Sequence, residues 1–262
     1  MERAAKGITL TNPDTKLIAA IDLPAALGLL TRLPVRVDSD KAAARGAAAA
    51  WAYPLAGMVI GLKQAVTLAL LLWLGVPAAI SAALALALAV VLTGAMHEDG
   101  LADSADGLWG GWDKARRLAI MKDSHIGSYG VIALALTLLL RWLGLVAIAG
   151  ADGFALVLIV IAGLSRAGMV GVMAALPHAR GDGLSRAVGR PAARTVWLAI
   201  GLGAGLAVVT GYLPLVILAA IVATLCALIA KAKIGGQTGD ILGAIQQLTE
   251  VALLVAVASM LA

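Results

Sequence analysis

Four long apolar stretches alternate with polar, charged segments along the 262-residue chain. They cover residues 51–95, 127–177, 195–230 and 241–262 and contain very few charged side chains. A run of about 18–20 apolar residues predicts a transmembrane helix, because a helix satisfies its own backbone hydrogen bonds where water is absent. Divided at their Gly and Pro residues, the stretches predict seven spans, at residues 52–75, 78–95, 128–148, 153–175, 195–211, 214–230 and 241–262.

The connections between these spans are of two kinds. Three are tight turns without Lys or Arg, namely Gly75-Val-Pro77, Gly150-Ala-Asp-Gly153 and Gly211-Tyr-Leu-Pro214. The N-terminal segment and the other connections hold all but three of the 20 Lys and Arg residues. Because cytoplasmic loops of membrane proteins carry an excess of bases, this alternation predicts a cytoplasmic N-terminus, a cytoplasmic segment 96–127 and an external C-terminus.

The composition supports one membrane domain. The chain is 61% apolar and 13% charged, against about 45–50% and about 25% in soluble domains. We therefore predict an all-α polytopic membrane helix bundle over residues 1–262, with residues 1–50 as a cytoplasmic or interfacial segment. Within it, residues 17–30 are apolar but too short to span, which predicts an interfacial or re-entrant helix. The net charge of +5 fits basic cytoplasmic loops, so we expect the lipid bilayer and no nucleic acid as a partner.

The polar segment 96–127 is the strongest candidate for chemistry, and we predict that it forms a catalytic loop. Four of the fifteen acidic residues fall within residues 98–106. If the segment is helical, Asp99, Asp103 and Asp106 share one face. Such close carboxylates repel one another unless a cation lies between them, and their oxygens suit Mg²⁺, which completes its shell with water and substrate phosphates. The segment therefore predicts a Mg²⁺ site, with His97 beside it for phosphate binding or proton transfer.

A basic group follows the acidic one. Arg116, Arg117 and Lys122 come shortly after it, next to Asp123 and Ser124. Bases beside metal-binding carboxylates fit a phosphate or pyrophosphate group, which needs both kinds of contact. The topology of basic cytoplasmic loops explains Arg116 and Arg117 equally well.

The remaining three bases, Lys63, Arg141 and Arg166, lie inside predicted spans. Ionisable side chains are costly there and usually face the bundle interior or a wet cavity. Arg166 lies near mid-span and is the better functional candidate, whereas Arg141 could instead reach the membrane surface by snorkelling.

The segment Gly235-Gly-Gln-Thr-Gly-Asp240 opens the last predicted span. A Gly-rich turn before a helix presents free backbone N–H groups that suit an anion. Asp240 either belongs to such a site or only caps the helix. Glu250 lies deep in the same span, where a carboxylate is costly, and is therefore a further functional candidate.

At these residues the sequence resembles the cobalamin synthase family, the adenosylcobinamide-GDP ribazoletransferases. The specific block is Thr93-Gly-Ala-Met-His-Glu-Asp-Gly-Leu-Ala-Asp-Ser-Ala-Asp-Gly107, followed by Ile120-Met-Lys-Asp-Ser-His-Ile-Gly127. Weaker matches lie, in chain order, at Leu30-Thr-Arg-Leu-Pro34, Tyr53-Pro-Leu-Ala-Gly57, Ser165-Arg-Ala-Gly168, Ala179-Arg-Gly-Asp-Gly-Leu184 and residues 235–240. The chain departs from the family pattern at Ala95, Glu98 and His125, where Gly, an apolar residue and Arg are common.

The resemblance implies a Mg²⁺-dependent transferase of the bacterial inner membrane. It would join α-ribazole, or α-ribazole 5′-phosphate, to adenosylcobinamide-GDP and release GMP, the last step of nucleotide-loop assembly. Asp99, Asp103 and Asp106 would hold the metal ion, and His97, Asp240 and Glu250 are unranked candidates for the base. Substrate and phosphate contacts would come from Arg32, Lys122, Asp123, Ser124, Arg166, Arg180 and Asp182. A homo-oligomer is a further expectation.

Two other functions fit parts of the pattern. Phospholipid phosphotransferases of the CDP-alcohol type also use spaced Asp residues, but Asp103 and Ser104 stand where their motif has Ala and Arg. A cation-dependent transporter would also bind an ion at an acidic segment, but the chain shows no internal repeat with matching broken helices.

Overall fold

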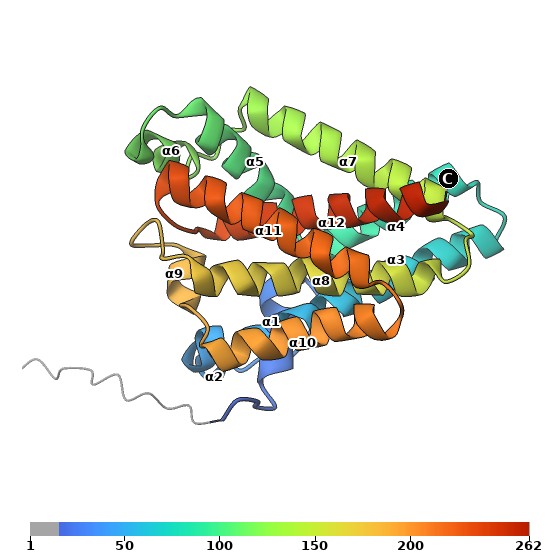
Figure 1. Cartoon of the computed structure of the whole chain (residues 1–262), viewed down its shortest axis with the longest axis horizontal. Helices are drawn as coiled ribbons and strands as arrows, with labels where there is room; N and C mark the ends of the chain where they lie inside the picture. The colour runs from blue at the N-terminus through green and yellow to red at the C-terminus, as the bar shows by residue number, and fades with distance from the viewer. Residues whose placement is uncertain (1–15, 262) are drawn as a thin grey trace, which may run out of the picture.

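The computed structural model describes residues 16–261, and every regular element in this part of the chain is a helix (Figure 1). The helices are α1 (Asp22–Leu30), α2 (Ser39–Arg45), the 3₁₀ helix η1 (Gly46–Ala52), α3 (Tyr53–Trp73), α4 (Ala78–Thr93), α5 (Met96–Gly110), α6 (Lys114–Ile120), α7 (Ser128–Ile148), α8 (Phe154–Ala175), α9 (Leu184–Val188), α10 (Ala193–Val209), α11 (Leu213–Ile234) and α12 (Gly239–Leu261). Residues 1–15 of the predicted N-terminal segment and Ala262, the last residue of the last predicted span, lie outside the described residues.

Seven long helices stand where the seven spans were predicted, namely α3, α4, α7, α8, α10, α11 and α12. In the described part of the chain, five stretches are long and apolar enough to cross a membrane, and α4 with α5 makes a sixth if this bent pair is one span. Helix α10 is apolar but, with 17 residues, is shorter than the helices that qualify and is not counted among them. The all-α, polytopic membrane fold is confirmed, and the count of seven stays a prediction.

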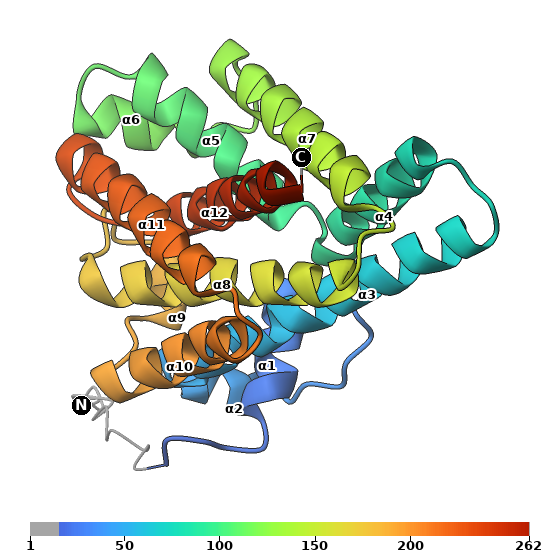
Figure 2. The same ribbon diagram turned by 45° about the vertical axis from the view of Figure 1, so that its right-hand side comes forward.

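The two ends of the bundle differ in character (Figures 1 and 2). In Figure 1 the tight turns after α3, α7 and α10 lie at the right-hand end, together with the C-terminus. The connections from α5 to α7, from α8 to α10 and from α11 to α12 lie at the left-hand end. We call the left-hand end, which holds the Lys- and Arg-rich connections, the charged end.

The N-terminal segment packs against the bundle. As predicted, its apolar part forms a short helix, α1, of nine residues. Asp22 is fully buried and accepts hydrogen bonds from Arg45 Nε (2.6 Å) and Trp51 Nε1 (2.7 Å). A buried carboxylate needs such partners, so this contact fastens α1 to η1.

The segment predicted as a catalytic loop, residues 96–127, is largely helical. Helix α4 ends at Gly94 and Ala95, both with positive φ, and α5 continues at an angle of 86°. Helix α5 then crosses α12 closely: a Cβ added at Gly100 would lie 2.8 Å from the Asp240 carbonyl oxygen. Only glycine fits this crossing, which places α5 against the start of α12.

The core has three layers along the bundle. One apolar cluster includes Ala56, Met173 and Ile245, and a second includes Leu68, Leu158 and Leu253. Between them, on α5, α7, α8 and α12, lies a buried polar layer formed by Glu98, Arg141, Ser165, Arg166, Gln246, Gln247 and Glu250. Charged side chains inside a membrane protein face the interior and pair with one another, as these do.

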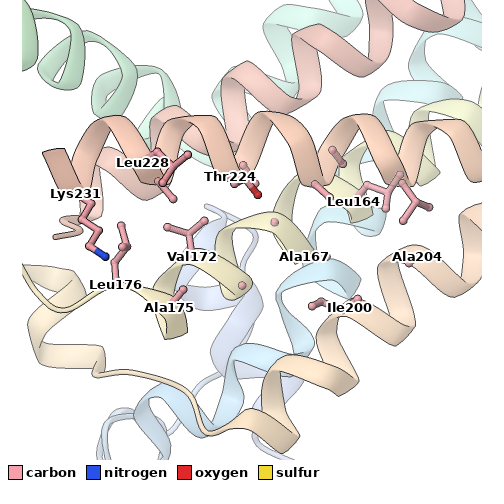
Figure 3. A pocket seen from close by; sticks show the side chains of 17 residues that line it. Leu164, Ala167, Val172, Ala175, Leu176, Ile200, Ala204, Thr224, Leu228 and Lys231 are labelled. Carbon is pink, nitrogen blue, oxygen red and sulfur yellow. The ribbon is translucent and has the colours of Figure 1, made fainter.

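An apolar groove of about 490 Å³ runs between α8, α10 and α11 (Figure 3). Its walls carry small side chains, such as those of Ala167 and Ala204, and Lys231 lies at one end. Helix α11 also exposes Ile217 and Ile221. In a membrane this side of the bundle faces lipid, and the groove is separate from the acidic residues of α5.

Candidate active site

An acidic group lies at the charged end, where α5 meets the start of α12. Asp103 is partly buried, and its carboxylate is within electrostatic range of Asp99, Asp106 and Asp240. Arg180, from the α8–α9 connection, is the cation that faces it. The structure therefore brings together side chains that are about 140 residues apart in the sequence.

Arg180 links this group to a second ion pair. Its Nη2 atom lies 3.2 Å from Asp240 Oδ2, and its Nε atom lies 3.8 Å from Asp182 Oδ1. Lys122 Nζ in turn lies 2.5 Å from Asp182 Oδ2. This hydrogen bond from Lys122 holds the pKa of the exposed Asp182 carboxyl below its usual value. Lys122, Arg180, Asp182 and Asp240, all predicted site residues, thus form one chain of alternating charge.

Backbone pairing holds the two connections together. The Ala179 amide donates to the Gln237 carbonyl (2.9 Å), and the Gln237 amide donates to the Pro177 carbonyl (2.8 Å). The side chain of Gln237 is buried and accepts a hydrogen bond from Ser185 Oγ (2.5 Å). These contacts fix Arg180 beside α12, and the sequence pattern did not single out Gln237.

Thr238, and not Asp240, caps α12. The Ile241 amide donates to Thr238 Oγ1 (3.2 Å), and the same hydroxyl donates to Asp240 Oδ2 (3.1 Å). The alternative that Asp240 is only an N-cap is therefore wrong. Its carboxylate belongs to the acidic group and pairs with Arg180.

Asp106 has a different environment from Asp99 and Asp103. Its two carboxylate oxygens accept hydrogen bonds from the amides of Gly127 (2.7 Å) and Gly130 (2.9 Å), at the start of α7. A carboxylate suits this position because helix N-termini present free N–H groups and a positive dipole end. Asp106 therefore joins α5 to α7, and its part as a metal ligand stays a prediction.

The buried polar layer holds two other predicted site residues, Arg166 and Glu250. Glu250 Oε1 lies 2.7 Å from Arg141 Nη2, and Oε2 lies 3.0 Å from Arg166 Nη1. Arg141 Nη1 also donates to Glu98 Oε1 (2.8 Å) and to Gln247 Oε1 (3.0 Å). Two guanidinium groups and two carboxylates make this layer neutral, as burial requires.

The contacts in this layer change the interpretation of two residues, Arg141 and Glu98. Arg141 is 3% exposed and pairs in the interior, so the snorkelling alternative is wrong. Glu98, which the sequence presented as a departure from the family pattern, is the partner of Arg141. The signal that could have found the pair is the presence of an Arg inside a span, because such a base needs a carboxylate.

His97 lies at the start of α5, beside the polar layer. It is 1% exposed, and neither ring nitrogen has a hydrogen-bond partner among the described residues. An unpaired buried polar group costs about 1–3 kcal/mol. His97 is therefore the buried side chain most open to a ligand.

The other predicted contacts are local. Arg32 is exposed and lies over Gly94, at the bend between α4 and α5. Asp123 and Ser124 are exposed between α6 and α7. Asp123 Oδ1 lies 2.7 Å from His125 Nδ1, which lowers the pKa of Asp123 and raises that of His125. In the described part of the chain, these contacts do not join the acidic group.

Nor do the described residues contain a closed metal cage. Among residues 16–261, no three His, Cys, Asp or Glu side chains converge closely enough to hold a metal ion. Mg²⁺, however, commonly takes one or two carboxylates and completes its shell with water and substrate phosphates. The partly open group of Asp99, Asp103 and Asp240 fits that kind of binding.

Fold and charge pattern together define a polytopic membrane protein with an ionisable site at one end of its helix bundle. The family profile described as cobalamin-5-phosphate synthase matches residues 22–258. The chain therefore belongs to this family. The match favours the family interpretation over the phospholipid phosphotransferase and the transporter.

Curated relatives extend this result over nearly the whole chain. The adenosylcobinamide-GDP ribazoletransferase of Bradyrhizobium diazoefficiens is 43% identical over 94% of this chain and 97% of its own length. Proteins of the same name from Azorhizobium caulinodans and Xanthobacter autotrophicus are 44% and 46% identical, over 90% and 91% of this chain and 94% and 96% of their own lengths. No solved structure matches the chain.

Proposed function

We propose that this chain transfers the cobinamide phosphate of adenosylcobinamide-GDP to α-ribazole or to α-ribazole 5′-phosphate. The products are adenosylcobalamin, or its 5′-phosphate, and GMP. Family membership over residues 22–258 supports the reaction. The observation that carries the location of the site is the acidic group of Asp99, Asp103 and Asp240 beside Arg180.

In this reaction a ribose hydroxyl oxygen forms a bond to the phosphorus attached to cobinamide. The bond from that phosphorus to the GMP oxygen breaks, and the hydroxyl proton passes to a base. Because the 5′-phosphate is retained when α-ribazole 5′-phosphate is the acceptor, the attacking group is a hydroxyl on the ribose ring. Phosphoryl transfer depends mainly on positioning and on neutralising charge.

The charged side chains of the site can be assigned to steps of this reaction. Arg180 and Lys122 neutralise and orient the pyrophosphate, as guanidinium and ammonium groups do for phosphates. Of the three candidate bases, Asp240 is best placed, because it belongs to the acidic group. Glu250 has both carboxylate oxygens paired with Arg141 and Arg166, which favours its charged, structural role.

We further propose that Asp99 and Asp103 would hold a Mg²⁺ ion. A bound ion would supply neutralisation of the charge that develops on the phosphate oxygens. The protein would lie in the bacterial inner membrane, with the charged end in the cytoplasm, where the nucleotide-activated substrate occurs. The bias of Lys and Arg toward this end supports that orientation.

The deciding assay mixes membranes containing the protein with adenosylcobinamide-GDP, α-ribazole and Mg²⁺ and measures GMP release. We expect GMP in amounts matching the adenosylcobalamin formed, and its loss when EDTA removes the metal ion. Absence of GMP above a vector control would refute the proposed reaction. Undiminished release in EDTA would refute only the dependence on a divalent cation.

A further inference from the structure

A second cavity, of about 50 Å³, lies between α1, α3, α5, α8, α9 and the start of α12, where Gly239 lines it and directly precedes Asp240 of the acidic group. Its walls are mainly apolar and include the side chains of Leu30, Tyr53, Met96, Met169, Met173 and Leu242. We call it the methionine-lined cavity. It is distinct from the lipid-facing groove of Figure 3, which lies on the other side of α8.

His97 is the polar feature of this cavity. Its imidazole lines the cavity and is 1% exposed, with neither ring nitrogen paired. An imidazole offers an N–H donor at one nitrogen and an acceptor at the other. A ligand that enters the cavity with a ring nitrogen of its own would therefore remove an energetic penalty already present in the protein.

A smaller cavity on the side of the polar layer also touches His97. Its volume is about 10 Å³, and Glu98 and Thr93 line it. This is about the space needed for one water molecule. One water there can satisfy one nitrogen of His97 and leaves the second nitrogen for a ligand in the methionine-lined cavity.

The cavity opens beside the residues proposed for the chemistry. Gly239, which lines it, directly precedes Asp240, and Ser185, which also lines it, bonds to Gln237. Its walls also collect residues from five separate segments that resemble the family: Leu30, Tyr53, His97, Leu184 and Gly239. These segments are far apart in the sequence, so their meeting here indicates a shared task rather than local packing.

We propose that the methionine-lined cavity binds the dimethylbenzimidazole base of α-ribazole, with His97 donating a hydrogen bond to the free ring nitrogen of the base. This inference rests on the proposed function and deepens it. The base is flat and apolar, except for that nitrogen, and matches the lining in both respects. With the base in this cavity, the attached ribose extends toward Gly239 and Asp240, where its hydroxyl meets the acidic group.

The methionines explain how a bicyclic base enters a cavity of this size. Methionine side chains are unbranched and polarizable, and they rearrange at low cost. Met96, Met169 and Met173 come from two different helices, α5 and α8, so they can move apart independently. When the base binds, the methionine side chains move aside and the cavity becomes larger, while His97 stays in place on α5.

The test compares Met173→Phe with Val172→Phe in purified protein reconstituted into lipid vesicles. Met173 lines the cavity, whereas its neighbour Val172 lines the groove of Figure 3. A bulkier ring in the cavity should raise the KM for α-ribazole about tenfold or more. The KM for adenosylcobinamide-GDP should stay unchanged, and Val172→Phe should alter neither constant.

His97 variants test the hydrogen bond. His97→Phe keeps a ring but removes the donor, and we expect it to raise the KM for α-ribazole. His97→Gln restores an N–H donor and should recover part of the loss. If His97 is instead the proton acceptor, kcat falls in both variants while the KM for α-ribazole stays constant, and that result would contradict the proposal.

Free dimethylbenzimidazole gives a readout that does not depend on a variant. It should inhibit wild-type turnover competitively against α-ribazole and not against adenosylcobinamide-GDP. Inhibition competitive against the corrinoid substrate would overturn the proposal, as would an unchanged KM for α-ribazole in both folded variants, Met173→Phe and His97→Phe. If Met173→Phe does not fold, the His97 variants and the inhibition pattern still decide. A wild-type protein that releases no GMP would instead refute the proposed function itself.

Discussion

The Asp residues of α5 separate into two environments that their spacing alone does not distinguish. Asp99 and Asp103 belong to the acidic group at the charged end, whereas Asp106 accepts two amide hydrogens from α7. Their spacing places these carboxylates on one face if the segment is helical, and Met96–Gly110 is indeed a helix. It could not show which neighbour each one meets, because that depends on where α7 and α12 pack.

This difference leads to opposite expectations for two conservative substitutions. Asp103→Asn removes a charge from the proposed metal and phosphate site, so turnover should fall about 100-fold or more, with membrane insertion unchanged. Asp106→Asn places an amide donor against the Gly127 or Gly130 N–H, which should lower the free energy of unfolding by about 1–3 kcal/mol. Initial rates and thermal unfolding in detergent measure both effects. Near-normal kcat in Asp103→Asn would show that the metal assignment is wrong.

The Glu98–Arg141 pair allows a second test at the residue scale. Removing one partner of a buried ion pair leaves an uncompensated charge and typically costs about 3–5 kcal/mol. We expect such losses in Glu98→Gln and in Arg141→Gln, and a smaller loss in the double variant than their sum, because the double variant restores neutrality.

Thermal unfolding of the four proteins measures the coupling between Glu98 and Arg141. Lys63→Gln is the control, since Lys63 is exposed on α3 and should unfold like the wild type. Strictly additive losses in the double variant would mean that the two side chains do not depend on each other.

At the scale of elements, the apolar runs predict the positions of the long helices well, but they do not predict the bend between α4 and α5. Long apolar runs form helices because a helix pairs all of its backbone groups within one segment, where the bilayer offers no water. The bend depends on positive φ at Gly94 and Ala95, and alanine gives no signal for that conformation. The same limit explains why residues 96–127 were predicted as a loop, although a helix was considered for their carboxylates.

Ala95 is a position of backbone strain. Its φ of 57° lies in the left-handed region, which costs a residue with a Cβ about 1–2 kcal/mol. Ala95→Gly should therefore leave the free energy of unfolding unchanged or raise it by up to about 1 kcal/mol. Ala105→Gly, inside α5, should lower it by about 0.5–1 kcal/mol. Equal losses in the two variants, measured by thermal unfolding, would contradict the assigned backbone conformation.

At the scale of the whole molecule, the distribution of bases agrees with the shape of the bundle. The turns without bases lie at one end, and the basic connections lie at the other (Figure 1). Single residues were harder to place, because the polar layer and the acidic group each join helices from distant parts of the sequence. Arg166 was predicted as a phosphate contact and Glu250 as a candidate base, and the structure shows that they pair with each other in the interior.

Topology reporters test the orientation of the bundle. Fusions after Ala262 and within residues 150–153 should report the external side, and a fusion within residues 189–191 should report the cytoplasmic side, following the bias of bases. The first two positions lie at the same end of the bundle only if the number of crossings between them is even. Opposite signals from these two fusions would show that a span has been gained or lost between them.

Helix α5 also fixes the distance between His97 and the acidic group. His97 and Asp103 lie on the same helix, six residues and therefore about 9 Å apart along its axis. Backbone hydrogen bonds, rather than adjustable side chains, set this length. Under the proposed binding mode, this fixed distance would select acceptors by the separation between their base and their reacting hydroxyl, and a nucleoside with a different separation would fail even if its base fitted the cavity. One residue inserted between His97 and Asp103 would rotate Asp103 about the helix axis by about 100° relative to His97, and Asp103 would then be misaligned for every acceptor.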